Sequence, residues 1–354
     1  MSINRRLWPR LLCVTLMLGA GVGCAPAVSK VMQAGDVSTA SLSALPPVLN
    51  LGSAALALAY SPDGQLLAAG SGAGQIELWP LRAGAAQSRP DQRRLPNQSA
   101  VNALAFSPDS SLLASAGADG RIRIWEVGAG AAGTGRLRLT LDPATYYVTS
   151  LAFSPDGTQL ASGSGDNTAL SGTGNSIKLW DVASGKLQAS LLGHTDVVTA
   201  VAYSPDGTQL ASASRDNTAR LWNVAARRET RTLRGHADDL TAAAFAPGGR
   251  QVVTGSADTT LKIWSLPDGQ LVRTLSSGAP VAAVAFSPDG TALASAGEDR
   301  VVRLWNPQTG AEQRVWAGHT APIRALAFAP DGAALASGGG LDKTVRVWKW
   351  GRGE

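Results

Sequence analysis

Seven tryptophans recur along the chain at nearly regular intervals, and this repetition constrains the fold more than any other feature of the sequence. They are Trp79, Trp125, Trp180, Trp222, Trp264, Trp305 and Trp348, separated by 46, 55, 42, 42, 41 and 43 residues. An interval of a little over 40 residues is typical of the four-stranded blade of a β-propeller. The spacing therefore predicts an all-β chain that folds as a seven-bladed β-propeller.

A turn of one kind lies before each of these tryptophans. The sequence S-P-D-G occurs at Ser61–Gly64, Ser154–Gly157, Ser204–Gly207 and Ser287–Gly290, with variants at Ser107–Ser110, Ala246–Gly249 and Ala329–Gly332. Proline presets φ, aspartate hydrogen-bonds its own backbone, and glycine tolerates positive φ. Alternating apolar residues flank the turn, as in Val197–Tyr203 and Leu210–Ser214. Each turn therefore predicts a β-hairpin.

Two further signals accompany the repeat. Gly-His precedes three of the hairpins, and an aspartate stands six residues before the tryptophan in five repeats, at Asp119, Asp216, Asp258, Asp299 and Asp342. With these signals the chain resembles the WD-repeat family from about residue 45 to 350. The resemblance implies a buried tetrad of His, Ser or Thr, Asp and Trp within a blade. The implied tetrads are His194, Ser212, Asp216 and Trp222 in blade four, His236, Thr254, Asp258 and Trp264 in blade five, and His319, Ser337, Asp342 and Trp348 in blade seven.

Four blades depart from this pattern. Blades two, three and six lack the histidine, and blade one lacks both the histidine and the aspartate because Ala73 stands at the aspartate position. Blade three also carries extra residues between Asp166 and Trp180.

The two ends of the chain are predicted to meet in one blade. Six of the seven tryptophans are followed by a segment that fits an outer strand, but only Lys349 to Glu354 follow Trp348. Pro47–Leu51 precedes the first inner strand and can supply the missing strand. We therefore expect it to pair near Val345–Trp348 and close the ring without an open edge.

The N-terminus has the composition of an export signal. Arg5, Arg6 and Arg10 precede an apolar run from Leu11 to Gly23 that is too short to span a membrane as a helix. The sequence Gly21-Val22-Gly23-Cys24 resembles the cleavage site of bacterial lipoproteins, so Cys24 is the predicted lipidation site. Ordinary cleavage after Ala27 is the alternative.

These features divide the chain into three parts. Residues 1–24 are predicted to be the signal, residues 25–44 a flexible tether rich in Ala, Ser and Val, and residues 45–354 the propeller, which we expect to be monomeric. The predicted location is the outer side of the bacterial cytoplasmic membrane, the periplasm or the outer membrane. Cys13 lies within the signal, so at most one cysteine remains after processing, and an intrachain disulfide is excluded.

Charge and side-chain chemistry argue against several classes of function. Beyond the three signal arginines the chain has 28 basic and 26 acidic residues, which gives no basic surface for nucleic acid. All three histidines belong to the Gly-His pairs, so none is left for a metal site or a general base. We therefore expect no cofactor and no catalysis. The predicted function is a scaffold that binds a protein or peptide, and the alternative is a propeller hydrolase or small-ligand enzyme of the envelope.

The blades differ most on one face of the ring, which we predict to be the partner-binding face. It is formed by the loop before each inner strand (the leading loop) and the loop that carries the tetrad aspartate (the Asp loop). Tyr146 and Tyr147 lie in the leading loop of blade three, Asp196 opens blade four, and Arg215 precedes the aspartate of blade four. Tyrosine and arginine are enriched at interaction hot spots. The alternative is that the tyrosines pack beneath the insertion at Ala169–Ser176.

Trp316 and Trp350 lie outside the series of seven tryptophans. Either they pack against a neighbouring strand or they contact a ligand, and the sequence leaves both interpretations open.

Overall fold

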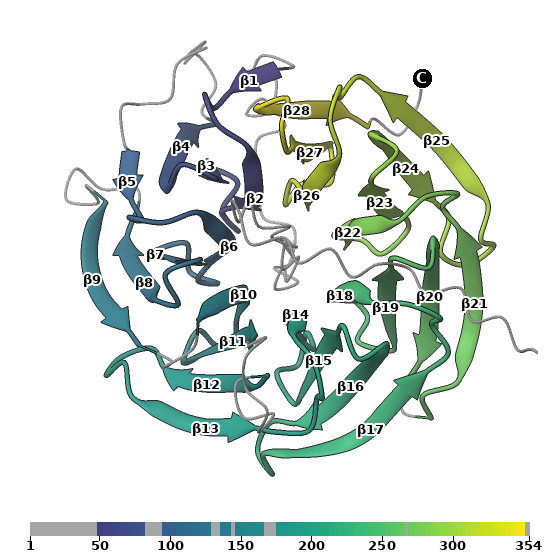
Figure 1. Cartoon of the computed structure of the whole chain (residues 1–354), viewed down its shortest axis with the longest axis horizontal. Helices are drawn as coiled ribbons and strands as arrows, with labels where there is room; N and C mark the ends of the chain where they lie inside the picture. Colours follow the sequence, from purple (N-terminus) through teal and green to yellow (C-terminus); the bar gives the residue numbers. More distant parts are fainter. Residues whose placement is uncertain are drawn as a thin grey trace, which may run out of the picture.

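Seven antiparallel sheets of four strands each surround a central axis in the computed structural model, and the chain visits them in order (Figure 1). The structure describes residues 48–81, 94–128, 135–142, 146–165, 175–266 and 268–350. The prediction of an all-β, seven-bladed β-propeller is thereby confirmed.

Each blade runs outward from the axis. The innermost strands are β2 (Ala55–Tyr60), β6 (Val101–Phe106), β10 (Tyr147–Phe153), β14 (Val198–Tyr203), β18 (Leu240–Phe245), β22 (Val281–Phe286) and β26 (Ile323–Phe328). The second strands are β3 (Leu66–Ser71), β7 (Leu112–Gly117), β11 (Gln159–Gly165), β15 (Gln209–Ser214), β19 (Gln251–Ser256), β23 (Leu293–Gly297) and β27 (Ala334–Gly339). The third strands are β4 (Gln75–Pro80), β8 (Ile122–Glu126), β12 (Ile177–Asp181), β16 (Thr218–Asn223), β20 (Thr260–Ser265), β24 (Val301–Trp305) and β28 (Thr344–Lys349). The outer strands are β5 (Arg94–Pro96), β9 (Arg136–Leu141), β13 (Leu187–Leu191), β17 (Arg228–Arg234), β21 (Leu271–Ser276), β25 (Glu312–Ala317) and, in blade seven, β1 (Val48–Asn50).

The core lies between the blades. Each blade turns the face with its tryptophan toward the preceding blade, so that Trp222 of blade four packs with Ala161, Ile177 and Leu191 of blade three. The inner strands are rich in alanine and are buried, except for one partly exposed residue in each of β10, β18 and β26. Small side chains allow seven strands to approach one axis, which accounts for a core of few aromatic residues.

Polar side chains also connect neighbouring blades near the axis. One residue of the inner strand, such as Thr199, lies at a bulge in the pairing with the second strand. Its hydroxyl donates to Leu240 O of the next blade at 2.8 Å, and Thr241 donates to Val281 O at 2.7 Å. Asn102 and Thr149 make the equivalent bonds from blades two and three. The bulge therefore directs a hydrogen-bonding side chain across the gap between blades.

The S-P-D-G turns lie together at one mouth of the ring. The fourth residue of each turn has positive φ, for example 73° at Gly157 and 61° at Ser110. The Gly207 α-carbon also faces Pro155 of the preceding turn, and a Cβ on it would lie 3.3 Å from that ring. Glycine is therefore favoured both by backbone conformation and by contact with the preceding turn.

β1 closes the ring. It pairs antiparallel with β28, with Val48 opposite Arg346, Leu49 opposite Val345 and Asn50 opposite Thr344. Leu49 is 2% exposed and belongs to a cluster shared by blades seven and one. The predicted splice of the two chain ends into the last blade is confirmed.

Candidate functional site

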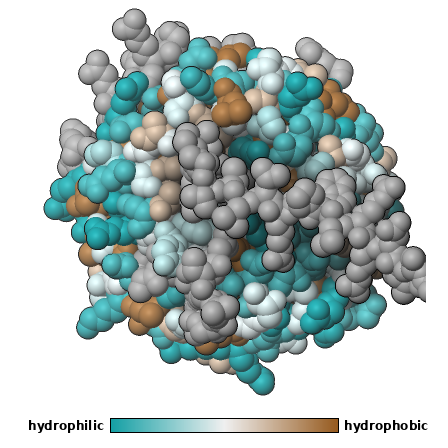
Figure 2. Space-filling model, in the orientation of Figure 1, coloured by the Kyte–Doolittle hydropathy of each residue, from teal (hydrophilic) through white to brown (hydrophobic). Residues whose placement is uncertain are grey.

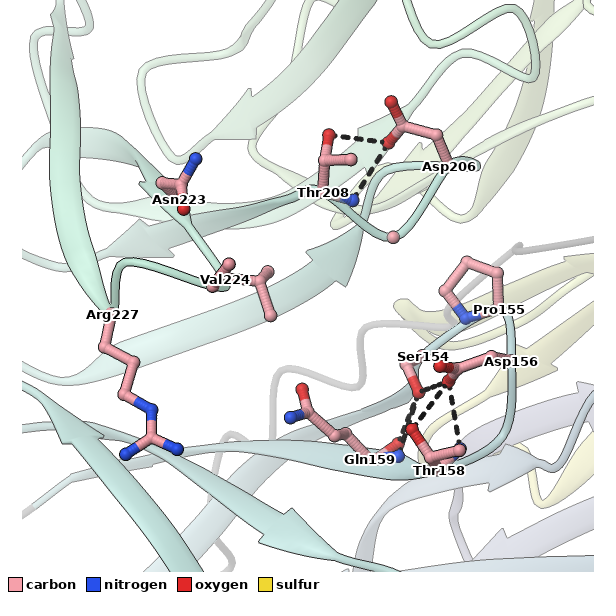
Figure 3. A pocket seen from close by; sticks show the side chains of 12 residues that line it. Ser154, Pro155, Asp156, Thr158, Gln159, Asp206, Thr208, Asn223, Val224 and Arg227 are labelled. Carbon is pink, nitrogen blue, oxygen red and sulfur yellow. Dashed lines mark hydrogen bonds between the residues drawn. The ribbon is translucent and has the colours of Figure 1, made fainter.

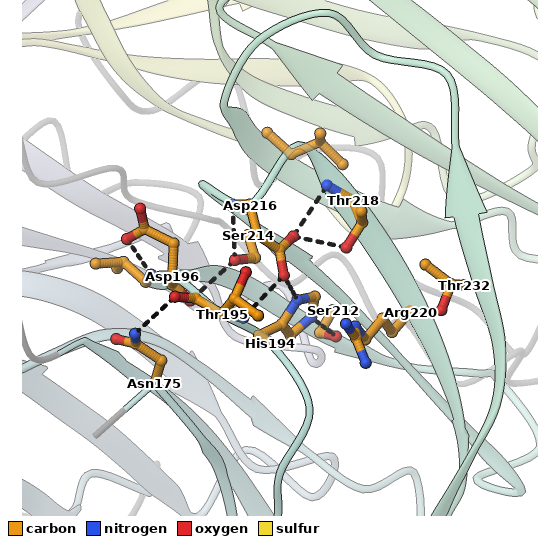
Figure 4. A network of polar contacts seen from close by, with 12 residues as sticks. Asn175, His194, Thr195, Asp196, Ser212, Ser214, Asp216, Thr218, Arg220 and Thr232 are labelled. Carbon is orange, nitrogen blue, oxygen red and sulfur yellow. Dashed lines mark hydrogen bonds and ion pairs between the residues drawn. The ribbon is translucent and has the colours of Figure 1, made fainter. Parts of the chain in front are cut away.

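The tetrad of blade four is a continuous hydrogen-bonded chain, of which Figure 4 shows His194, Ser212 and Asp216. Trp222 Nε1 donates to Ser212 Oγ at 2.8 Å, and His194 Nε2 lies 2.7 Å from the same oxygen. The serine hydroxyl already accepts from the indole, so its own hydrogen is available for Nε2, which leaves Nδ1 as the donor to Asp216 Oδ2 at 2.8 Å. This order of donors suits a neutral imidazole.

Blades five and seven repeat this arrangement with distances of 2.7 to 2.9 Å. The partners are His236 with Asp258 and Thr254, His319 with Asp342 and Ser337, and the indoles of Trp264 and Trp348 with Thr254 and Ser337. The extra residue in the Asp loop of blade seven leaves the geometry intact.

The environment of the tetrads favours a charged aspartate beside a neutral histidine. Burial raises the pKa of Asp258, but hydrogen bonds from Thr260, the Ala237 amide and His236 outweigh burial and bring the pKa to about 2. Burial lowers the pKa of His236 and His319 below the ordinary value of 6.5, although the aspartates oppose this effect. The ring nitrogens of all three histidines are occupied within the tetrads, so these side chains serve the fold.

Blade two uses a substitute for the histidine of the tetrad. In blade two Asn97 takes the place of the histidine, and its Oδ1 accepts from Ser115 Oγ at 2.7 Å. Sequence reasoning missed this residue, although its position relative to Trp125 marks it. Asp119 instead pairs with Arg123 at 2.7 Å.

Blade one carries an acid where the other six blades carry a base. Glu77 stands two residues before its tryptophan and is 2% exposed. Burial raises the pKa of Glu77, and Arg94 at 3.4 Å lowers it in part.

The residues proposed for partner binding lie on the face formed by the leading loops and Asp loops, but they face different neighbours. Tyr146 is 64% exposed, whereas Tyr147 is half-buried. Tyr147 Oη and the Val197 methyl groups all lie within 3 Å of the position that a Cβ on Gly165 would occupy. Tyr147 therefore packs toward the leading loop of blade four. Only Asn175 and Ser176 of the insertion lie within the described residues, so packing of the tyrosines beneath it stays a prediction.

Arg215 turns away from these tyrosines toward blade five. Its Nε lies 3.9 Å from Asp239 Oδ2, and both side chains are about one-third exposed or more. Burial raises the pKa of Asp239, Arg215 lowers it, and Asp238 and Asp196 raise it again. The exposed Asp196 thus belongs with Arg215 and Asp239 in a charged cluster that bridges blades four and five. Sequence reasoning missed Asp239 because its pairing depends on the rotation between two blades.

A groove of about 650 Å³ opens at the opposite mouth of the ring, between the S-P-D-G turns of blades three and four (Figure 3). Its acidic groups are engaged by their own turns. Asp206 accepts from Ser204 and Thr208, and these hydrogen bonds lower its pKa against the effect of burial. Arg227 donates to Gln188 O at 3.0 Å. These polar groups are therefore engaged in hydrogen bonds within the turns or with the neighbouring strand β13.

Neither a cluster of metal ligands nor a membrane-spanning helix is found among the residues that the structure describes. The face shown in Figure 2 is largely hydrophilic, with hydrophobic residues in small separate spots. Cys24 and most of the insertion, from Ala169 to Gly174, lie outside the described residues.

The fold and the tetrads define a repeat propeller, and comparison with known families agrees. The family model of the WD domain, G-beta repeat, matches residues 50–80, 91–126, 135–181 and 310–349, and the model of the IFT122 first beta-propeller matches residues 165–314. No curated protein matches the chain. The chain is a WD40-repeat seven-bladed β-propeller, and WD40 propellers generally serve as scaffolds for protein interactions and are typically non-catalytic.

Proposed function

We propose that this protein is a non-catalytic scaffold, exported and held at the membrane by a lipid on Cys24, which binds a protein or peptide through the face of the leading loops and Asp loops. The observation that supports it most is the division of roles among polar residues. The histidines are enclosed in tetrads, whereas Tyr146, Asp196 and the Arg215–Asp239 pair are exposed at one face. A rigid ring with varied exposed loops favours recognition over chemistry.

The blade three and blade four sector is the part of this face that we assign to the partner. Tyr146 offers an exposed aromatic ring at one side of the sector, and the charged cluster of Asp196, Arg215 and Asp239 lies at the other. An exposed tyrosine beside polar groups is the composition of an interaction hot spot.

Site-specific photo-crosslinking tests this assignment. A photoreactive amino acid at Tyr146 should capture a defined partner in intact cells, and the same group at Thr208, exposed on an S-P-D-G turn of the opposite face, should not. In the protein without the photoreactive group, Tyr146→Ala, Tyr147→Ala and Arg215→Ala should each reduce the amount of partner that is captured. Arg227→Ala removes a charge on the opposite face and is the matched control. Undiminished capture by all three folded variants would move the site to another sector.

Export and anchoring are supported by the order of the N-terminal residues, in which three arginines, an apolar run and small residues lead to Cys24. The Cys24→Ser variant should move from the membrane fraction to the soluble fraction, and mass spectrometry of the wild type should find a lipid on the N-terminal cysteine. A wild-type protein that is soluble and begins at Val28 would contradict the anchor.

A further inference from the structure

Among the residues that the structure describes, a strand covers only half of the outer edge of blade seven. In blades two to six the fourth strand continues beside the third as far as its tryptophan, as with Glu229 opposite Trp222. In blade seven β1 pairs with Thr344, Val345 and Arg346 only. Within the described part of the chain, no strand accompanies the other half of β28, from Val347 to Lys349.

The exposed half of β28 directs backbone groups outward. Trp350 N–H donates inward to Ala333 O, whereas Lys343 O accepts from Leu51 N on the outer side. Successive residues of a strand alternate in the direction of their hydrogen bonds. Val347 and Lys349 therefore point their N–H and C=O groups toward the open edge.

The chain before β1 is not suited to cover this edge. Pro46 and Pro47 immediately precede Val48. In the register of β1, Pro47 would stand opposite Val347, and without an amide hydrogen it cannot donate to the Val347 carbonyl oxygen. The sequence therefore disfavours a regular continuation of the β1–β28 ladder beyond Val48.

An aromatic surface lies beside the open edge. Trp316 of β25 stacks on Trp348, with ring centroids 6.0 Å apart and planes inclined by 23°. The equivalent position of β25 is leucine in all six other blades, at Leu49, Leu95, Leu141, Leu191, Leu233 and Leu275, each of them buried.

Trp316 is too large for this pocket and stays partly exposed. Trp348, unlike the other six blade tryptophans, is also partly exposed. Trp350 packs on Phe328, with ring centroids 5.9 Å apart. Trp316 and Trp350 therefore pack against neighbouring residues with one side of their rings, as one of the two predictions had it. Part of each ring remains at the surface.

The charge around this edge is basic. Arg314 lies over Trp316, with its guanidinium carbon 5.7 Å from the ring centroid, and Lys349 is exposed at the end of β28. The one acid of β25, Glu312, faces Arg303 at 3.3 Å. Arg314 lies over Trp316, which stacks on Trp348, so its charge lies close to β28, and Lys349 belongs to β28 itself.

We propose that the edge of β28 from Val347 to Lys349 is a second docking surface, which accepts an extended segment of a partner protein as an added antiparallel strand. The backbone groups of Val347 and Lys349 would pair with the segment. Apolar side chains on one face of that segment would contact Trp316 and Trp348, and acidic side chains would meet Arg314 and Lys349. This surface is distinct from the loop face of blades three and four.

Hydrogen exchange of the full-length protein tests the proposal, with a short synthetic peptide of alternating valine and glutamate as the probe. The peptide should slow exchange at Val347 and Lys349 and change the fluorescence of the neighbouring tryptophans. A peptide with the same side chains but N-methylated at alternate residues lacks the backbone donors and should bind about ten-fold more weakly, as expected for loss of one or two hydrogen bonds. A valine and lysine peptide should bind more weakly still.

Three variants separate the contributions of backbone, charge and aromatic surface. Lys349→Pro removes one outward N–H and one charge, and Lys349→Gln removes the charge alone, so the proline variant should lose more affinity. Lys349 does not direct its amide toward β27, so the fold should tolerate the proline. Trp316→Leu restores the residue of the other blades and should retain the melting temperature while weakening binding.

Several results would overturn the proposal. Equal affinity of the methylated and unmethylated peptides, or of Lys349→Pro and Lys349→Gln, would show that no strand is added. Protection of the Val347 and Lys349 amides in the full-length protein without peptide would show that the chain itself, or a second copy, covers the edge. Sedimentation at several protein concentrations would then distinguish these two occupants.

Discussion

Single residues at equivalent positions of different blades differ in whether their polar atoms are satisfied, and the inner-strand tyrosines show this most clearly. Tyr203 Oη bonds to Gln159 Oε1 of the preceding blade at 3.3 Å. Tyr60 occupies the same position in blade one, and its buried hydroxyl has no hydrogen-bond partner among the residues that the structure describes. Ala334 stands in blade seven where blade three has Gln159, so no side-chain oxygen is available there.

We therefore predict that removal of the two hydroxyl groups has opposite effects. Tyr60→Phe should raise the free energy of unfolding by about 1 kcal/mol, because it removes a buried polar atom that lacks a partner. Tyr203→Phe should lower it by about 0.5–1 kcal/mol, because it removes a hydrogen bond. Urea denaturation of both variants measures the difference. The same sign for both would show that the hydroxyl groups have similar surroundings in solution.

The tetrads predict a second contrast at this scale. Asp216→Ala should cost about 1–3 kcal/mol, because His194 and the Thr195 amide lose a buried acceptor. Trp222→Ala should cost about 3–5 kcal/mol through loss of packing as well. Ala73→Ser in blade one, where no tetrad exists, is the control and should change stability little. Equal losses at positions 73 and 216, measured by the same denaturation, would contradict a special role for the tetrad.

Strands and turns are the scale at which the sequence was most informative. The turn residues and the position of each tryptophan predict hairpins within one blade, and the residue count after Trp348 predicts that β1 completes the last blade. Contacts between blades were harder to predict. The pairs Arg215–Asp239 and Trp316–Trp348 depend on the angle between neighbouring sheets, which no local pattern encodes. Aligning the repeats would still have shown Trp316 as the exception among leucines.

Because β1 closes the ring, we predict that this short strand contributes as much to the free energy of unfolding as a longer outer strand does. Leu49→Ala should lower the free energy of unfolding by about 2–4 kcal/mol, because Leu49 is buried in the cluster that joins blades seven and one. Leu275→Ala is the matched control. Leu275 is 4% exposed and lies in β21, the outer strand of a blade whose four strands follow one another in the chain. A much smaller loss at Leu49 than at Leu275 would mean that β1 detaches from β28 without unfolding the ring.

The whole ring couples its stability to pH through the three tetrads. His236 and His319 have pKa values lowered by burial, so at mildly acidic pH the unfolded chain binds protons that the folded chain excludes. Stability is then fully present above pH 6.5 and falls as the pH drops below it. The aspartates act in the same direction at lower pH, because the pKa values of Asp216, Asp258 and Asp342 are lowered in the fold.

This coupling predicts a measurable loss of stability on mild acidification, before the aspartates titrate. Each histidine can contribute up to about 1.4 kcal/mol per pH unit. Urea midpoints should therefore fall between about pH 7.5 and pH 5.5. Blade two suggests the matched variant, because Asn97 there replaces the histidine and bonds to Ser115 without titrating. His236→Asn combined with His319→Asn should lower stability at neutral pH and reduce the pH dependence. An unchanged slope in this double variant would show that the histidines are not the groups that link folding of the ring to pH.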